Sequence, residues 1–312
     1  MNHKLKMKLR SYAKKNELFS KLYHKAARKK MEHFQELSDE DFLRRKFKEN
    51  TGKELDLEHP QTFNEKLQWL KLYDHNPLYT QLVDKYRVRQ YVAEKIGEEY
   101  LNDLYGVYEH FDDIDFNALP DQFVLKCNHD CGSIVICKDK QSFDFAAAKS
   151  KLEKALKRNY FYFGREWPYK NVKPLIVAEK YLENLNDRDL KDYKFFCFSG
   201  IPECLFIATD RATKDMRLDF YDMNFCHLPF ERSYPNAAKK IEKPESFDEM
   251  KELAAKLSEG IPFVRVDFYE INEKPLFGEM TFYPGGGTDV FRPEKWDYIY
   301  GEMLRLPGKK NV

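Results

Sequence analysis

The sequence predicts an α+β protein in which a mostly helical first third leads into a region of short strands. In the first third, apolar residues recur with a period near 3.6 residues behind polar capping residues. From about residue 105 onward the pattern changes, and short apolar strands are separated by polar turns. The densest chemistry in the sequence falls in one predicted strand pair, residues 262–288.

Length and composition indicate a globular chain. Its 312 residues suffice for two domains or one large one, and a hydrophobic fraction of 42% is ordinary for a folded protein. No apolar run approaches the roughly 18 residues that a membrane-spanning helix needs, and the N-terminus lacks the apolar segment of a signal peptide. The six cysteines form no Cys-x-x-Cys pair, so we expect free thiols in a cytoplasmic protein.

Charge is spread unevenly along the chain. The net charge is only +1, yet residues 1–30 hold eleven Lys and Arg against one acid, Glu17. This pattern predicts a basic helix over 2–37, which either packs on the main domain or docks on anionic lipid or a lipid-linked glycan at the inner face of the membrane. We expect no nucleic-acid partner, because the arm lacks interleaved aromatic residues on a recognisable platform.

Capping residues and apolar stripes predict the other helices. Ser38 begins the second helix, which ends near residues 50–52, and Pro60-Gln61-Thr62 opens a third that runs to Tyr73. Further helices are expected at 84–96, 144–164, 246–259 and 294–304.

Two short strands, 123–127 and 134–137, enclose a small polar loop, residues 128–133. Backbone N–H groups of such a loop can hold phosphate oxygens, and Lys126 at the end of the first strand can reach the same phosphate. A plain hairpin turn is the alternative interpretation, because the loop contains only one glycine, Gly132.

A second group of strands is predicted at 175–182, 192–198 and 203–208. Glu179 interrupts the apolar run of the first of these strands, and a buried carboxylate requires a partner. The charged stretch 209–222 that follows is interpreted as a lid over the substrate or, as the alternative, as a solvated loop.

A hairpin centred on Glu273 is predicted for residues 262–288. Its first arm alternates apolar and polar residues, so Asp267 points away from the apolar face. In its second arm, Phe277 and Glu279 are expected to share a face.

The pairing of the predicted hairpin sets Asp267 opposite Glu279 and Arg265 opposite Thr281. Two facing carboxylates repel each other, and a divalent cation between them is a natural remedy because Mg²⁺ prefers carboxylate oxygens. The neighbouring Arg265 can hold an anionic phosphate or carboxylate. The alternative is an exposed hairpin with ordinary surface charges.

Six segments carry a family resemblance, and their order along the chain is more specific than any one of them. They are TFNEKLQWLK, DKYRVRQYV, FVLKCNH, EKYL, DYKFFCFSG and RVDF…FGEMTFYPGGG. Over roughly residues 60–305 the sequence resembles the TupA-like ATP-grasp family of surface-polysaccharide biosynthesis proteins. The resemblance implies an ATP-grasp fold, in which two α+β subdomains grip ATP. The implied divisions are a basic helical arm at 1–55, a helical part at 56–120, the ATP-grasp core at 121–305 and a tail at 306–312.

The resemblance also implies nucleotide contacts. Lys126 matches the lysine that grips the ATP phosphates, and the loop 128–133 matches the mobile phosphate loop, although it holds less glycine than in many ATP-grasp enzymes. The implied contacts are His129, Gly132 and Ser133 of the loop, Glu179, Tyr181 and Leu182 of the adenine hinge, and Asp192, near the ribose, with Lys194.

The hairpin residues match the family's metal site. Asp267 and Glu279 match the two carboxylates that bridge Mg²⁺, and Arg265 matches an arginine that steadies the transferring phosphoryl group. Thr281 occupies the place of the usual Asn ligand, which departs from the family pattern. The third metal contact is therefore either the Thr281 hydroxyl or missing.

The activity that the resemblance implies is an ATP-dependent carboxylate–amine ligase. A carboxylate attacks the γ-phosphate of ATP, and an amine then attacks the acyl-phosphate to give an amide. The implied partners are an amino-acid or amine donor and an anionic sugar acceptor such as a uronic acid. Arg211, Lys214 and Arg217 of the predicted lid suit such an acceptor.

Three alternatives stay open. A glycosyltransferase often holds its metal with Asp-x-Asp, which occurs at 113–115 and 187–189. A zinc site has the right ligand types in Cys127, His129 and Cys131, but their spacing is not that of a usual zinc knuckle. An ATP-grasp fold that has lost its activity is the third, suggested by the departures from the family pattern.

Overall fold

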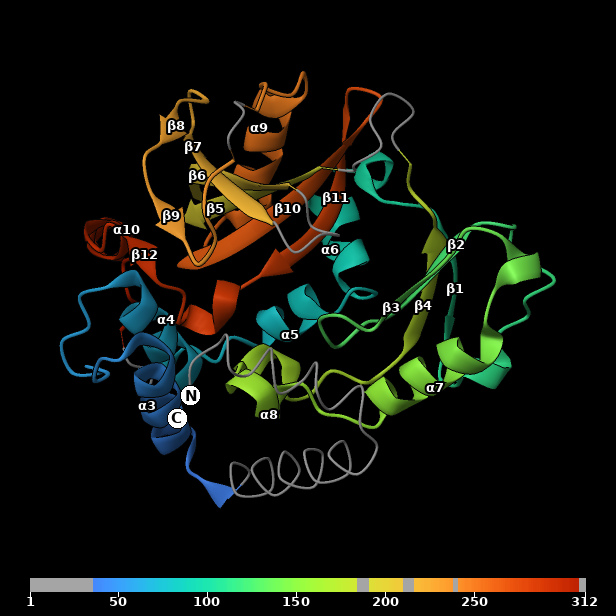
Figure 1. Ribbon diagram of the computed structural model, residues 1–312, viewed down its shortest axis with the longest axis horizontal. Helices are drawn as coiled ribbons and strands as arrows, with labels where there is room; N and C mark the ends of the chain where they lie inside the picture. The colour runs from blue at the N-terminus through green and yellow to red at the C-terminus, as the bar shows by residue number, and fades with distance from the viewer. Residues whose placement is uncertain (1–35, 184–190, 210–215, 238–240, 309–312) are drawn as a thin grey trace.

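The structure is a computed structural model, and it describes residues 36–183, 191–209, 216–237 and 241–308 (Figure 1). The basic helix predicted over 2–37 therefore lies almost wholly outside the described residues, as do Arg211 and Lys214 of the predicted lid. Within the described ranges, no helix combines the length and the apolar character that crossing a membrane requires. All six cysteines are described and free, as predicted.

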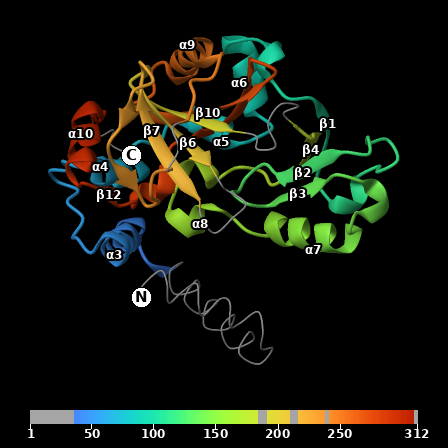
Figure 2. The ribbon, with the colours of Figure 1, turned by 45° about the horizontal axis from the view of Figure 1, so that its top comes forward.

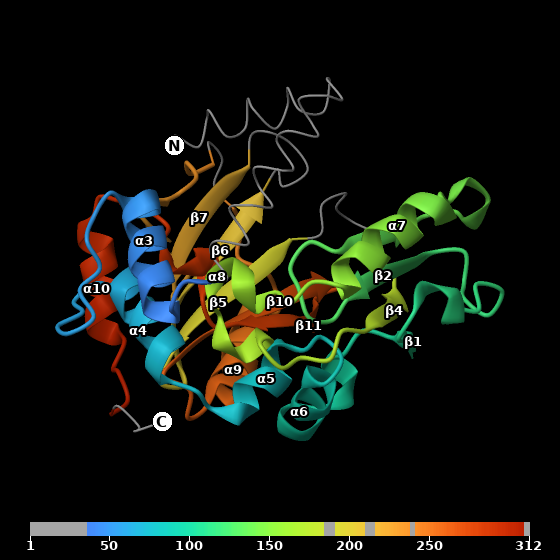
Figure 3. The same cartoon turned by 90° about the horizontal axis from the view of Figure 1, so that it is seen from below.

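Two antiparallel sheets form the framework of the molecule (Figures 1 and 3). The small sheet has the strand order β1-β4-β2-β3, and the large sheet has the order β11-β10-β5-β6-β7-β8. The small-sheet strands are β1 (Leu104–Tyr108), β2 (Phe123–Cys127), β3 (Ile134–Cys137) and β4 (Ile176–Lys180). The large-sheet strands are β5 (Asp192–Phe198), β6 (Ile201–Thr209), β7 (Arg217–Asp222), β8 (His227–Leu228), β10 (Phe263–Ile271) and β11 (Lys274–Thr281). A separate pair consists of β9 (Glu231–Arg232) and β12 (Phe291–Arg292).

The helices lie around these sheets, and the early ones begin where the sequence predicts. They are α3 (Asp39–Thr51), α4 (Phe63–Tyr73), α5 (Pro77–Val83), α6 (Val88–Lys95), α7 (Phe145–Leu156), α8 (Phe161–Gly164), α9 (Phe247–Ser258) and α10 (Lys295–Met303). Ser38 caps α3 by accepting the N–H of Asp41, and Thr62 caps α4 in a capping box with Glu65.

Two predicted helices are shorter than expected, because side chains compete for the backbone. The helix predicted at 84–96 begins only at Val88, since the Asp84 carboxylate accepts the N–H groups of the next turn. The helix predicted over 144–164 ends at Leu156, and the short α8 follows a break. At this break the Asn159 side chain accepts the N–H of Phe161 at 3.0 Å.

The small sheet has a core of its own with α7 (Figure 2). Leu152 of α7 packs in this core with Leu125 of β2 and Ala178 of β4. Because side chains alternate along a strand, Lys126 and Glu179 project from the opposite face. The two residues that the sequence singles out on these strands are thereby kept out of the core.

The large sheet is covered on both faces. Phe247 of α9 packs against Phe195 with ring centroids 5.9 Å apart, whereas Phe63 of α4 packs at the same distance against Phe196 on the other face. Arg265 pairs with Phe196 and therefore lies on the α4 face. The predicted metal-binding face of the hairpin thus faces the same side as the N-terminal helices.

A close contact between α10 and the start of α4 gives a test of this packing. A Cβ added at Gly301 would lie 2.0 Å from the carbonyl oxygen of Gln61 and 3.0 Å from the backbone nitrogen of Phe63. We therefore expect Gly301→Ala to destabilise the fold by about 1–3 kcal/mol, although alanine is usually the better helix residue by about 1 kcal/mol. Urea denaturation measures the effect, with the adjacent exposed Glu302→Ala as control. A Gly301→Ala protein as stable as the control would contradict the contact.

Candidate active site

The predicted pairing of the hairpin is confirmed at the residues that matter for chemistry. Asp267 of β10 pairs with Glu279 of β11, and Arg265 pairs with Thr281. Asp267 is 1% exposed, so the alternative of an ordinary surface hairpin is wrong.

The same hairpin differs from the prediction nearer its turn. The turn consists of Asn272 and Glu273, both at positive φ, and β11 then bulges at Gly278. The bulge compensates for the tighter turn, and the predicted register is therefore restored beyond it. Between turn and bulge, Phe268 pairs with Phe277, which lies on the apolar face and not beside Glu279 as predicted.

Three side-chain oxygens of the hairpin converge on a single nitrogen. Arg265 Nη2 donates to Asp267 Oδ2 at 2.7 Å, to Glu279 Oε1 at 2.8 Å and to Thr281 Oγ1 at 2.9 Å. Arg265 Nε also donates to Asp267 Oδ1 at 2.7 Å. The oxygens of the three predicted metal ligands therefore surround one point, at which Arg265 Nη2 lies. They are hard oxygen donors, which is the set that Mg²⁺ prefers, so these residues fit the ion.

The positive charge of Arg265 and the negative charge of Glu279 stabilise each other. Burial opposes the charge on Arg265, but Asp267 and Glu279 outweigh it and raise the pKa of the guanidinium. Burial likewise opposes the charge on Glu279, but Arg265, followed by Lys194 and Lys85, lowers the pKa of the carboxyl to about 2. Glu279 is therefore an anion at any physiological pH.

The free energy of unfolding should depend on pH in the acid range because of the Glu279 carboxylate. The pKa of Glu279 in the folded protein lies below its ordinary value of 4.5, so its contribution is complete above about pH 4.5 and is lost as the pH falls toward 2. We expect the difference in unfolding free energy between the unsubstituted protein and Glu279→Gln to narrow from about pH 7 to about pH 3.5. Urea denaturation across that range measures it, and a difference independent of pH would contradict the ion pair.

Two residues that are expected to contact the nucleotide, Asp192 and Lys194, lie next to Asp267 and form an ion cluster with it. The Lys194 ammonium bonds Asp267 Oδ2 and lies 3.2 Å from Asp192 Oδ2. Asp192 is 1% exposed and Lys194 8% exposed. In this structure the Asp192 carboxylate has almost no surface to offer a sugar hydroxyl, and the ribose contact stays a prediction.

The partner that Glu179 requires is Lys126. Lys126 Nζ lies 2.6 Å from Glu179 Oε2, and both side chains are largely buried. Beside them, Ile134 and Ile136 of β3 pair with Lys126 and Val124 of β2 and so share their face, with 42% and 51% of their surface exposed. An exposed apolar pair next to a buried ion pair is a surface that suits a flat ring. The alternation of β3 contained this signal, which the sequence interpretation did not use.

The loop 128–133 is anchored at its start and open at its tip. The Asn128 side chain bonds the backbone of Lys173 and Leu175, and His129 Nε2 lies 3.2 Å and 3.1 Å from two carbonyl oxygens at the end of α7. Burial lowers the pKa of His129. The His129 side chain therefore anchors the loop and is only 2% exposed, while the nucleotide contact of this residue stays a prediction. Gly132 at the tip is exposed, whereas the Ser133 hydroxyl bonds the Asp130 carboxylate.

Lys85 links this loop to the hairpin, and the sequence interpretation missed it. Its backbone N–H donates to Asn128 O at 3.2 Å, and its ammonium bonds the Asp130 carbonyl oxygen. The same lysine lowers the pKa of Glu279, and the pKa of the loop residue Cys131 responds to burial and then to Glu279. The tip of the loop and the predicted metal site are therefore electrostatic neighbours. The segment DKYRVRQYV contained the lysine, but nothing in its spacing pointed to the hairpin.

The glycine run after β11 is held against α4. Gly285, Gly286 and Gly287 all have positive φ, and a side chain at Gly287 would run into Gln68. Gln68 Nε2 donates to the carbonyl oxygens of Gly286 and Gly287, and Lys71 Nζ donates to that of Gly286 at 2.8 Å. Burial lowers the pKa of Lys71 to about 8. These bonds fix the path of the chain beyond Thr281.

Several predictions away from the hairpin are corrected or lie outside the described residues. Residues 217–222 form a strand, not a loop, and Arg217 pairs with Thr209. In the first Asp-x-Asp segment, Asp113 and Asp115 accept neighbouring N–H groups and stabilise local turns. The second segment, 187–189, is not described. Tyr181 and Leu182 directly follow β4, with the Lys138 ammonium 5.3 Å from the Tyr181 ring centroid.

The zinc alternative finds no support in the described part of the chain. Cys127 and His129 are buried, and their polar atoms face carbonyl oxygens of α7. Among the described residues, no three His, Cys, Asp or Glu side chains are grouped so that they could hold a metal ion. The predicted Mg²⁺ site contains two carboxylates and the hydroxyl of a threonine. It therefore has only two side chains of these four types, fewer than the three that such a group requires.

Solved structures with partial likeness to this chain include several ligases. A D-alanine–D-alanine ligase from Helicobacter pylori is 16% identical with a TM-score of 0.43, covering 78% of this chain and 69% of that chain. The Bacillus anthracis D-alanine–D-alanine ligase complexed with ATP is 13% identical with a TM-score of 0.38, covering 65% and 54%. An L-amino acid ligase from Bacillus licheniformis is 14% identical with a TM-score of 0.41, covering 72% and 49%. The chain thus spans only about half of the last two proteins.

Comparison with protein families gives a match over most of the chain. No curated protein sequence matches significantly. The family described as TupA-like ATPgrasp matches residues 65–305, a range that contains both sheets, the loop 128–133 and the hairpin. This match does not depend on the partial structural likenesses. The chain belongs to the TupA-like ATP-grasp family and has its ATP-grasp fold.

Proposed function

We propose that this protein is an ATP-dependent carboxylate–amine ligase that forms an amide through an acyl-phosphate. The observation that carries the proposal is the convergence of the Asp267, Glu279 and Thr281 oxygens on one point. That point lies within electrostatic reach of the loop 128–133. A triphosphate needs both features, a concentration of metal-binding oxygens and a loop with open backbone, at one place.

The nucleotide is proposed to lie along the face of the small sheet that carries Lys126 and Glu179. The exposed apolar side chains of Ile134 and Ile136 pack against the base, and the backbone of Tyr181 and Leu182 offers hydrogen bonds to its edge. Lys126 exchanges its bond to Glu179 for the phosphates, which frees the Glu179 carboxylate to accept from the amino group of adenine.

Asp267, Glu279 and Thr281 would hold Mg²⁺, which neutralises the charge of the triphosphate and orients it when bound. The Lys194 ammonium bonds Asp267 Oδ2 and holds this carboxylate in position. Arg265 supplies positive charge for the transferring phosphoryl group, because its guanidinium is permanently charged and already bonded to these oxygens.

The proposed reaction needs only ATP, a carboxylate and an amine. A substrate carboxylate oxygen bonds to the γ-phosphorus as the bond to the β,γ-bridging oxygen breaks, which gives an acyl-phosphate and ADP. The nitrogen of a neutral amine then attacks the acyl carbon, and phosphate leaves as the amide forms with release of a proton.

The proposed biological role is the attachment of an amino acid to a uronic acid or polymer in surface-polysaccharide biosynthesis. The excess of Lys and Arg in residues 1–30 suits contact with an anionic, lipid-linked glycan at the inner face of the membrane. Arg217, at the edge of the charged stretch 209–222, adds a cation for an anionic acceptor.

Nucleotide products test the proposal. The full-length protein is incubated with Mg²⁺ and ATP, a panel of uronic acids, and a panel of amino acids, with hydroxylamine added in parallel to trap an acyl-phosphate. We expect ADP with every productive pair and a hydroxamate in the trapping reaction. Release of AMP would indicate adenylation instead, and binding of nucleotide-sugars without binding of ATP would overturn the proposal.

A further inference from the structure

A pocket is lined by residues of the loop 128–133, of α7 and α8, and of the segment between these two helices. We call it the α8 pocket. It has a volume of about 390 Å³. Residues 130–133 of the loop line it, including the predicted nucleotide contacts Gly132 and Ser133, together with Lys151, Arg158, Tyr160 and Phe163. None of the assigned nucleotide or metal roles uses its α7 and α8 side chains.

One wall of the α8 pocket is aromatic. The rings of Tyr160 and Phe163 stack with centroids 5.6 Å apart and an interplanar angle of 30°. Phe163 is 44% exposed, although apolar rings of this size are usually buried. A stacked pair with an exposed face offers a flat apolar surface to the carbon face of a ring-shaped ligand.

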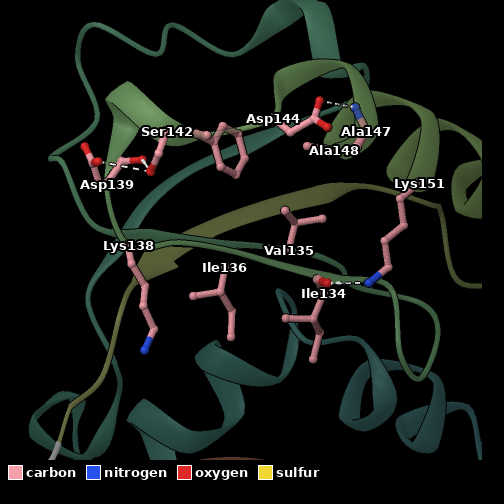
Figure 4. A pocket seen from close by; sticks show the side chains of 11 residues that line it. Ile134, Val135, Ile136, Lys138, Asp139, Ser142, Asp144, Ala147, Ala148 and Lys151 are labelled. Carbon is pink, nitrogen blue, oxygen red and sulfur yellow. Dashed lines mark hydrogen bonds between the residues drawn. The ribbon is translucent and has the colours of Figure 1, made fainter.

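The pocket also carries a net positive charge. Lys151 extends from α7 to the start of β3, where its ammonium donates to the Ile134 carbonyl oxygen at 2.6 Å (Figure 4). Arg158 is exposed, and its Nε donates to the Lys154 carbonyl oxygen at 3.0 Å. The acid of the pocket, Asp130, is bonded by the Ser133 hydroxyl. Two cations against one acid favour an anionic ligand.

The aromatic wall connects the α8 pocket to the reacting centre. Tyr160 meets Tyr169 edge to face, with ring centroids 4.9 Å apart. Burial and then the Glu166 carboxylate raise the pKa of both phenols, and Glu279 contributes to each, as the smallest of the causes at Tyr160. Glu279 is therefore within electrostatic reach of the aromatic wall of the pocket.

We propose that the α8 pocket binds the sugar substrate as a pyranose that carries an anionic group, with its ring on Tyr160 and Phe163 and its anion beside Arg158 and Lys151. The inference rests on the proposed ligase function and adds the place and the chemistry of the sugar site. A carboxylate and a phosphate group share the required charge, so a sugar acid and a sugar phosphate are the two sources to separate.

Binding measurements on the full-length protein test the site. Calorimetric titrations in the presence of Mg²⁺ and a non-hydrolysable ATP analogue compare D-glucuronate, D-glucose 6-phosphate and uncharged D-glucose. We expect one of the two anionic sugars to bind at least about tenfold more tightly than glucose. Arg158→Gln should weaken that binding about tenfold, and Phe163→Ala should weaken it by about five- to tenfold.

Matched controls lie close to the α8 pocket but outside it. Lys157→Gln removes one exposed charge beside Arg158, and Phe145→Ala removes a ring that is 40% exposed at the start of α7. Both should change sugar binding less than about twofold. Equal binding of glucose, equal losses in the controls, or no sugar binding by a protein that binds the ATP analogue would each overturn the inference alone. Failure to bind the analogue would overturn the proposed function and the inference with it.

Discussion

Glu279→Gln is expected to reduce ATP-dependent ADP release by at least about 100-fold while the protein stays folded. The amide keeps the shape of the side chain but removes the negative charge that faces Arg265 Nη2 at 2.8 Å. The three-oxygen site then retains one anion, Asp267, and its attraction for a divalent cation falls accordingly. Because 41% of the Glu279 side chain is exposed, water can solvate the amide, and the protein stays folded although it loses the contribution of the ion pair.

ADP release at saturating Mg²⁺ and ATP measures this effect, and the thermal midpoint of each protein monitors folding. Glu273→Gln is the matched control, because Glu273 is an exposed glutamate in the turn of the same hairpin. We expect the control to keep its activity. A folded Glu279→Gln protein with more than about one third of the original rate would remove Glu279 from the metal site.

The position of Glu279 was predictable from the sequence because a strand has a period of two. Alternation in the first arm fixes Asp267 on the polar face, and any hairpin that pairs Asp267 with Glu279 also pairs Arg265 with Thr281. The bulge at Gly278 was not predictable in this way, because strict alternation assumes that each residue of one strand pairs with one residue of the other. The predicted pairing beyond the bulge is correct only because the bulge and the two-residue turn cancel.

The roles of the polar residues next to the hairpin were harder to predict, because they depend on burial. Asp192 and Lys194 have the residue types of nucleotide contacts. However, β10 pairs with β5 and sets Asp267 beside Lys194, so that both residues belong to an internal ion cluster with Asp267. The sequence suggests that His129 is a ligand-binding residue of the loop. In the structure, two carbonyl oxygens at and just after the end of α7 lie within hydrogen-bonding distance of its ring. Lys85 is the reverse case, an ordinary helix-start lysine that tertiary contacts bring to the loop.

Asp267→Asn is expected to destabilise the protein by about 3–5 kcal/mol as well as to abolish ATP turnover. The carboxylate is 1% exposed and bonded by Arg265 through two nitrogens and by the Lys194 ammonium. An amide leaves two largely buried cations with less negative charge between them, and its own N–H group points at donors. Urea denaturation in the presence of EDTA measures this loss of stability without any contribution from a bound metal. Asp248→Asn, which breaks the exposed 2.7 Å pair with Lys243, should cost less than about 1 kcal/mol.

A double-mutant cycle shows whether the loss comes from an unpaired charge. If Lys194 is left uncompensated in Asp267→Asn, then adding Lys194→Met removes that buried cation, and the double variant should be less destabilised than the sum of the single variants by at least about 1 kcal/mol. Additive losses would mean that Lys194 and Asp267 act independently despite their contact. Coupling with full activity in Asp267→Asn would instead reduce this cluster to a structural ion pair, and the hairpin would hold no metal. The cycle and the turnover measurement together therefore separate the two roles of one buried carboxylate, as the anchor of β5 on β10 and as the inner ligand of the site.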